Sequence, residues 1–150
     1  PDARLEGLVP RVAVALFDKL SNKPLLASRV TVSMMQLHSV LLTDLLGTNR
    51  PRDERRLRVK ECRDRSIIVE NLSEVPCSSS RDVMDTLAQG RHAFLVAMTQ
   101  MSMRSSCNHL ITILKVESTD AQTGEAVRGK LALCDLAAPE MADGLAFQAC

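Results

Sequence analysis

Two motifs in this 150-residue sequence resemble parts of a phosphate site. Residues 124–130 match the phosphate-loop pattern G-x-x-x-x-G-K, but Leu131 follows where a Ser or Thr is needed. A phosphate loop also opens a helix, whose N-terminal N–H groups hold the phosphates. Here the residues from Lys130 onward predict a strand, so this match does not predict a nucleotide site.

The second motif has two parts: Asp135, at the end of that predicted strand, and the polar run S-S-C-N-H at residues 105–109. Ligands of open α/β sheets bind beyond the carboxyl ends of strands. A strand-terminal Asp holds the water shell of Mg²⁺ in nucleotide hydrolases, and Ser hydroxyls at 105 and 106 could reach a metal or a phosphate. Alone, each part is weak, because many strands end in Asp and a Ser pair before a strand is more often a turn.

Hydrophobic periodicity predicts the elements that must position these residues. Apolar residues between Val9 and Leu20 recur at helical spacing, with Pro10 in the first turn. A second helix is predicted over residues 81–89, with a Ser of 78–80 as its cap and Gly90 as the residue after its end. Strands are predicted over residues 30–37, 110–116 and 130–136, with a loop at 119–124. This order predicts one α/β domain with a mixed sheet.

Composition excludes several classes of protein. The chain is 45% hydrophobic, which is enough for a buried core, and its 19 basic and 18 acidic residues leave little net charge. With three Phe and no Tyr or Trp it lacks stacking platforms for nucleic acid, and no apolar stretch is long enough to cross a membrane. We therefore expect neither nucleic acid nor membrane as a partner. Five Cys without a C-x-x-C pair predict reduced thiols.

The strongest local charge lies in residues 50–65, which contain eight basic and four acidic side chains. In its second half, apolar and charged residues alternate enough to predict a strand over residues 57–61. This strand is expected to pair with residues 67–69 as a hairpin. An Arg-rich hairpin is usually a solvated edge, and it is also a surface that an acidic partner could bind.

In their order along the chain, these segments resemble the kinesin motor domain, from just after its phosphate-binding helix to just past its second switch. Residues 6–11, E-G-L-V-P-R, are similar to E-G-I-I-P-R, and residues 30–46 are similar to V-S-x-x-E-I-Y…D-L-L. Residues 105–109 are similar to the first switch, S-S-R-S-H, and residues 129–140 to the second, G-K-L-x-L-V-D-L-A-G-S-E. The hairpin and residues 79–90 fall in the same order.

The resemblance implies a partial kinesin-type P-loop NTPase fold, α/β with a mixed central sheet flanked by helices. It forms one domain over residues 1–150, with the phosphate loop outside this sequence. It also implies that ATP binds with Mg²⁺, which Ser106 and Asp135 would hold indirectly. Glu140 would form the ion pair, or latch, that closes the site. The first-switch positions are Ser102, Ser105, Ser106, Cys107, Asn108 and His109, and the second-switch positions are Asp135 and Ala138. The positions expected to bind tubulin are Arg55, Arg56, Arg58, Lys60, Arg63 and Arg65.

Several of these positions depart from the family pattern. The first-switch Arg, which pairs with Glu140 to close the site, is Cys107, and a thiol cannot replace a bidentate guanidinium. The next Ser is Asn108. The second-switch Gly is Ala138, and the following Pro139 stiffens that loop. The upstream first-switch Asn is Ser102, and the strand Glu and Tyr are Gln36 and His38.

Three functions remain open from the sequence. The first is a degenerate motor that keeps a binding or structural role on microtubules or with other cytoskeletal proteins, in the cytoplasm and including axonemal sites, with weak or no ATP hydrolysis. The second is an active ATP-dependent microtubule motor whose phosphate loop lies upstream of Pro1. The third is a scaffold outside the cytoskeleton, which would tolerate charge reversal at Arg55, Arg56 and Arg58.

Overall fold

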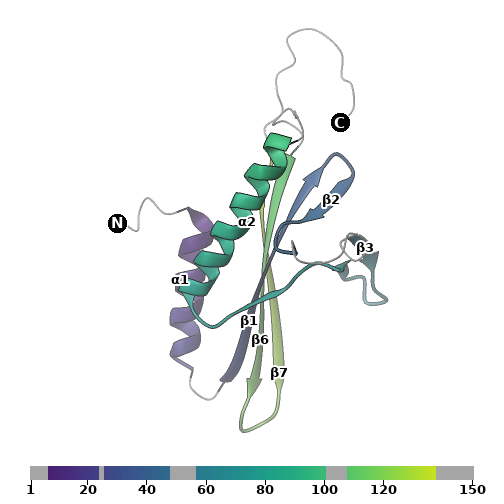
Figure 1. Cartoon of the computed structure of the whole chain (residues 1–150). Coiled ribbons are helices and arrows are strands. Elements are labelled where there is room, and N and C mark those ends of the chain that lie inside the picture. The colour runs from purple at the N-terminus through teal and green to yellow at the C-terminus, as the bar shows by residue number, and fades with distance from the viewer. Residues whose placement is uncertain (1–6, 24–25, 48–56, 101–107, 138–150) are drawn as a thin grey trace.

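The computed structural model describes residues 7–23, 26–47, 57–100 and 108–137, which form two helices and seven strands (Figure 1). In chain order these are α1 (Leu8–Ser21), β1 (Leu26–His38), β2 (Leu41–Asp44), β3 (Arg58–Glu61), β4 (Ile67–Glu70), β5 (Val75–Cys77), α2 (Ser80–Gln100), β6 (Asn108–Asp120) and β7 (Ala126–Asp135). Neither described helix combines the length and hydrophobicity that a membrane crossing requires.

The main sheet has the strand order β2-β1-β6-β7, and β5 also pairs with β1. The long strands β1 and β6 pair over their full length, from Leu26 opposite Asp120 to His38 opposite Asn108. The α/β fold class is confirmed. Every strand pairing among the described residues is antiparallel, so the mixed strand directions expected from the sequence do not occur in this part of the chain.

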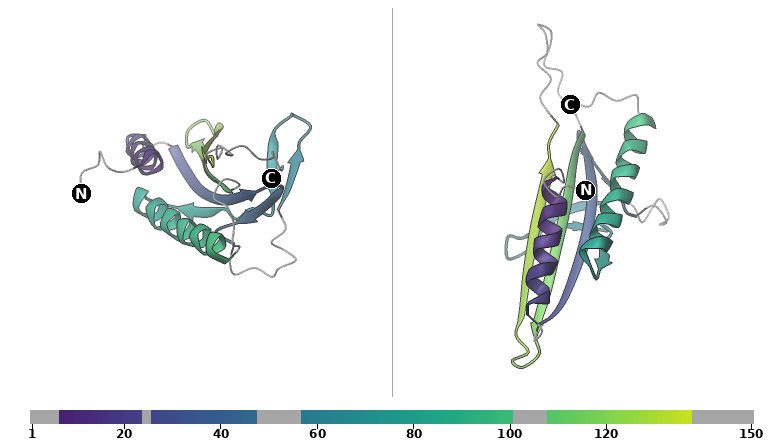
Figure 2. Two further views of the ribbon diagram at one scale, coloured as in Figure 1. Left: turned by 90° about the horizontal axis from the view of Figure 1, so that it is seen from above. Right: turned by 90° about the vertical axis from the view of Figure 1, so that its left-hand side faces the viewer.

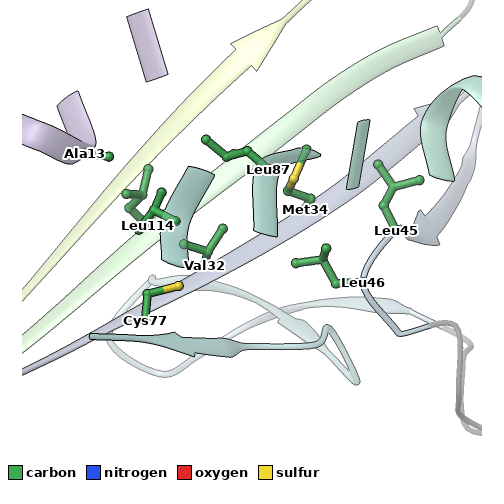
Figure 3. Close-up of a cluster of buried hydrophobic side chains, with 9 residues drawn as sticks. Ala13, Val32, Met34, Leu45, Leu46, Cys77, Leu87 and Leu114 are labelled. Atoms are coloured by element: carbon green, nitrogen blue, oxygen red, sulfur yellow. The ribbon is translucent and has the colours of Figure 1, made fainter. Parts of the chain in front are cut away.

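The two faces of the sheet bury two separate apolar clusters, because neighbouring residues of β1 point to opposite sides. Val32 and Met34 belong to the larger cluster, in which both helices pack against the sheet (Figure 3). Met35 belongs to the smaller one with Leu57 and Ile113. The hairpin of β3 and β4 stands apart from the two helices in Figure 1 and in the left-hand view of Figure 2.

The helix α1 agrees with its predicted periodicity and begins two residues before Pro10. The helix α2 has a reciprocal cap: the Asp82 N–H donates to Ser79 Oγ at 3.1 Å, and Asp82 Oδ2 accepts from the Ser78 and Ser79 N–H groups at 2.8 and 3.1 Å. The hydrogen bonds from Ser78 and Ser79 lower the pKa of Asp82. The predicted start of the helix is therefore confirmed within one residue.

The predicted end of the second helix is wrong. Gly90 lies inside α2, which continues to Gln100. Gly90 is buried, and a Cβ placed there would lie 2.3 Å from Met34 Sδ. The glycine therefore allows α2 to approach β1 closely, and this packing outweighs the helix-ending tendency of glycine.

One carboxylate joins the end of β2 to the segment before β5, a contact that the sequence did not predict. Asp44 Oδ1 accepts the N–H groups of Leu46 and Gly47 at 3.0 and 3.1 Å, and its Oδ2 accepts that of Ser73 at 2.9 Å. The short strand β5 that follows was not predicted either. These bonds hold Leu46 in place, where it contributes to the larger apolar cluster.

Candidate functional site

The ends of two predicted motifs meet at one end of the sheet. Asp135, the last residue of β7, lies opposite Leu110 of β6, two residues after the start of that strand. Just beyond, the backbone N–H of Ala137 donates to Nδ1 of His109 at 3.1 Å. This bond fixes the exit of β7 to the start of β6, so the chain segments that flank both switch-like motifs are adjacent in the fold.

A pocket of about 460 Å³ opens beside this junction, on the face of the sheet that the helices cover. The N-terminal turn of α1, the middle of α2 and the strands β1, β6 and β7 supply its walls. Among the described residues that line it, most are apolar, and Arg91 and Asp135 bring the two charges. A cation, a carboxylate and an apolar floor are typical of a site that binds a small polar ligand.

Asn108 is the first residue of β6 and its side chain points into the protein. Asn108 and Gln36 are only 5% and 3% exposed, and Gln36 Nε2 donates to Asn108 Oδ1 at 2.6 Å. The sequence singled out both positions as departures from a family pattern, but nothing in it indicated that they touch. Residues 36 and 108 are 72 positions apart, so only the pairing of β1 with β6 brings them together.

The remaining predicted site residues divide between described and undescribed parts of the chain. Asn108, His109 and Asp135 lie at the junction. Those outside the described residues are Ser102, Ser105, Ser106, Cys107, Ala138, Glu140, Arg55 and Arg56. Gly129 and Lys130 lie inside β7, as expected for a motif that is not a phosphate loop.

The donor atoms at the junction suit a hard cation held through water. Asp135 is exposed, and its carboxylate oxygens are of the type that Mg²⁺ prefers. Within the described residues no three His, Cys, Asp or Glu side chains gather closely enough to hold a metal directly. Asp135 could therefore hold a magnesium ion there only through the water shell that the ion keeps.

The basic hairpin is the second candidate surface, and its predicted strands are confirmed as β3 and β4. Its turn is tight: Asp64 accepts hydrogen bonds from the hydroxyl and N–H of Ser66 at 2.7 and 3.0 Å, which lower the pKa of Asp64. Lys60 pairs with Glu70 at 3.1 Å, so part of the positive charge is neutralised within the hairpin.

Three arginines give the hairpin its remaining positive charge. Arg58, Arg63 and Arg65 are exposed, and no carboxylate among the described residues pairs with them. On the inner side, Val69 packs against the smaller apolar cluster. The hairpin is therefore anchored through its apolar side, which leaves these guanidinium groups available to a partner.

Comparison with known proteins identifies the fold. The family described as the kinesin motor domain matches residues 2–146. The chain belongs to the kinesin family. The resemblance and the fold class predicted from the sequence are thereby confirmed.

Individual kinesins agree with this assignment. The chain is 35% identical to kinesin-like protein 3 of Schizosaccharomyces pombe over 136 residues, and 33% identical to the kinesin heavy chain of Neurospora crassa over 141 residues. These alignments cover 90% and 93% of the chain but 24% and 14% of the relatives. A solved structure of a fast kinesin matches 95% of the chain with a TM-score of 0.82 and 30% identity, and the match covers 40% of that kinesin chain.

Proposed function

We propose that this chain is part of a kinesin-like protein that binds microtubules in a binding or structural role and hydrolyses ATP weakly or not at all. The observation that carries the proposal is Cys107, which stands where the family pattern has the arginine of the first switch. The fold of the chain matches that of a fast kinesin. A retained fold with altered reactive positions is what a degenerate motor requires.

The loss of the arginine removes a contact of the transition state. A guanidinium paired with Glu140 would close the site around the terminal phosphate, and the Cys107 thiol offers neither the charge nor the paired donors. Positioned cations in phosphoryl transfer contribute about 10³- to 10⁵-fold in rate. Replacement of this one group is therefore sufficient to reduce turnover to a small residual rate.

The second switch is altered in the same direction. Ala138 stands in place of a glycine, and Pro139 restricts its backbone away from the helical region. A glycine at this place can turn its N–H towards a phosphate at little steric cost, whereas alanine before proline cannot do so freely. Sensing of the terminal phosphate is therefore weakened at both switches.

Binding of nucleotide is a separate matter from its hydrolysis. Ser106 and Asp135 are the residues that would hold ATP with Mg²⁺, through a hydroxyl and a water-mediated carboxylate. When bound, ATP supplies the phosphoryl group, and Mg²⁺ neutralises charge on its phosphates. In this chain Asp135 orients water at the end of β7, and the bond from Ala137 to His109 keeps that end beside β6.

The partner surface in this proposal is the basic hairpin with the neighbouring Arg55 and Arg56. The described arginines of the hairpin, Arg58, Arg63 and Arg65, are exposed, and the surface of tubulin is acidic. Attraction of this type falls as salt is added, because exposed charges are screened within about 10 Å at 0.1 M salt. The proposed location is accordingly on cytoplasmic microtubules, including axonemal ones.

Two assays on the full-length protein test the proposal. We expect co-sedimentation with microtubules at low salt, together with phosphate release that microtubules do not stimulate. Stimulated release at the rate of an active kinesin would refute the degenerate motor and support the active one. Absence of co-sedimentation at low salt would refute the microtubule role and leave the scaffold.

Matched variants separate the hairpin from general charge effects. Reversal of Arg58 and Arg63 to Glu should weaken microtubule binding by about tenfold or more, since buried or closely apposed charges at an interface contribute several kcal/mol. Reversal of Arg81, an exposed arginine on α2, should leave it unchanged. Restoring Cys107→Arg with Ala138→Gly should raise any residual phosphate release.

A further inference from the structure

Three departures from the family pattern gather at one corner of the sheet. Gln36 and His38 are alternate residues of β1 and therefore share a face, and His38 lies directly opposite Asn108 of β6. Nothing in the sequence connected them, because 69 residues separate His38 from β6. Asp135 of β7 lies one strand further along the sheet. Leu110 of β6 is opposite both Gln36 and Asp135 and separates them.

The contact at this corner is short and buried. Gln36 Nε2 donates to Asn108 Oδ1 at 2.6 Å, and both side chains are almost fully removed from water. All fully buried side-chain nitrogen and oxygen atoms in the described part of the chain have hydrogen-bond partners. A buried amide that loses its partner bears its full desolvation cost, so the two side chains hold each other in place.

We propose that Gln36 and Asn108 form an amide clamp that fixes the start of β6, and with it the attachment point of residues 101–107, in one position with or without bound nucleotide. Asn108 is a positioning residue in this proposal, and its side chain is committed to the sheet. The proposal rests on the assignment of residues 101–107 to the first switch of a degenerate motor.

The chemistry of the pair explains why such a clamp would be static. Both amides are almost fully buried and engaged with each other, so little of either is exposed to a phosphate or Mg²⁺. Replacing one member by an apolar side chain removes this bond from the other, whereas replacing both removes the two bonded groups together. The family-type Glu and Ser at these positions would instead bring a carboxylate and a hydroxyl, which respond to nearby charge.

Hydrogen exchange of the full-length protein tests the clamp. The variants are Gln36→Met, Asn108→Leu and the double variant, each close in size to the native side chain. We expect either single change to raise the opening equilibrium of residues 108–112 by about five- to 100-fold. The double variant should open less than the product of the two single effects, by a factor of about three or more.

A second cross-strand bond provides the matched control. Ser28 and Ser118 pair through their hydroxyls at 2.8 Å at the opposite end of the same two strands. Ser28→Ala should leave exchange at residues 108–112 unchanged. The clamp variants in turn should leave exchange at residues 117–120 unchanged, which separates local positioning from a general loss of stability.

The clamp and the proposed function fail in different ways. Single variants that exchange like the native protein, or effects of the two that simply multiply, would overturn the clamp. Protection at residues 108–112 that changes when ATP and Mg²⁺ are added would overturn its static character. Rapid microtubule-stimulated phosphate release by the native protein would refute the degenerate motor, and it would leave the exchange result standing.

Discussion

Gly90→Ala tests how closely α2 packs on the sheet. The added Cβ would lie 2.3 Å from Met34 Sδ, 2.9 Å from Met34 Cε and 3.3 Å from Leu46 Cδ2. Met34 is only 1% exposed, so its thioether has no solvent to move into. Either the Met34 side chain leaves its rotamer or α2 moves away from β1.

Two opposing effects set the size of the change. Alanine is about 1 kcal/mol more favourable than glycine in a helix interior. Overpacking of a filled core costs about 1–3 kcal/mol. We therefore expect Gly90→Ala to lower the free energy of unfolding by about 1 kcal/mol, taking the middle of that range.

A second substitution reports on the same contact. Met34→Ala alone should cost about 2–5 kcal/mol, because it opens a cavity under α2. In the Gly90→Ala background the new methyl group occupies part of that cavity. The combined loss should therefore be smaller than the sum of the two single losses by about 1 kcal/mol.

Urea unfolding of the full-length protein, followed through hydrogen exchange of α2 and β1, measures these differences. Gly129→Ala is the matched control, because a Cβ at Gly129 meets no atom within 4 Å. It should leave stability unchanged or raise it slightly. If Gly90→Ala were as stable as this control, or if its effect simply added to that of Met34→Ala, the close approach of α2 would be refuted.

Three further predictions concern single polar contacts. Asp44→Ala should lower the free energy of unfolding by about 2 kcal/mol or more in urea titration, since three backbone N–H groups lose their acceptor; equal stability to the native protein would contradict this. Because hydrogen bonds lower the pKa of Asp82, its contribution is present above about pH 4 and is lost as the pH falls below that value. Asp82→Asn should therefore flatten the acid limb of the stability–pH curve, and an unchanged acid limb would contradict this. His109→Ala should speed amide exchange at Ala137 by about two- to tenfold, and unchanged exchange would mean that the 3.1 Å bond contributes nothing.

The local sequence pattern was sufficient to predict an element where the burial of one face determines its structure. The helix over residues 8–21 and the strands on either side of the hairpin turn follow directly from periodicity. It failed at Gly90, where a packing contact with a residue 56 positions earlier overrides the local preference of glycine. The strand at residues 75–77 was missed for a similar reason, since pairing with β1 and not its own three residues makes it a strand.

The candidate site was predictable in part. The resemblance assigned His109 to the first switch and Asp135 to the second, and the structure brings the ends of their strands together. The bond between Gln36 and Asn108 could not be predicted from the sequence, because it depends on the register of β1 against β6. A sequence shows which residues are unusual, whereas strand register decides which of them touch.

The strand β1 separates two interiors, with Met34 on one side and Met35 on the other. A shift of a single residue along this strand would exchange the two sides, and both interiors would be filled by the wrong side chains at once. The chemistry of surrounding loops can change one substitution at a time during evolution. The number of residues in β1 cannot change in such small steps, because each insertion or deletion exchanges its two faces. Insertions and deletions in this lineage should therefore be confined to the turns and loops outside β1.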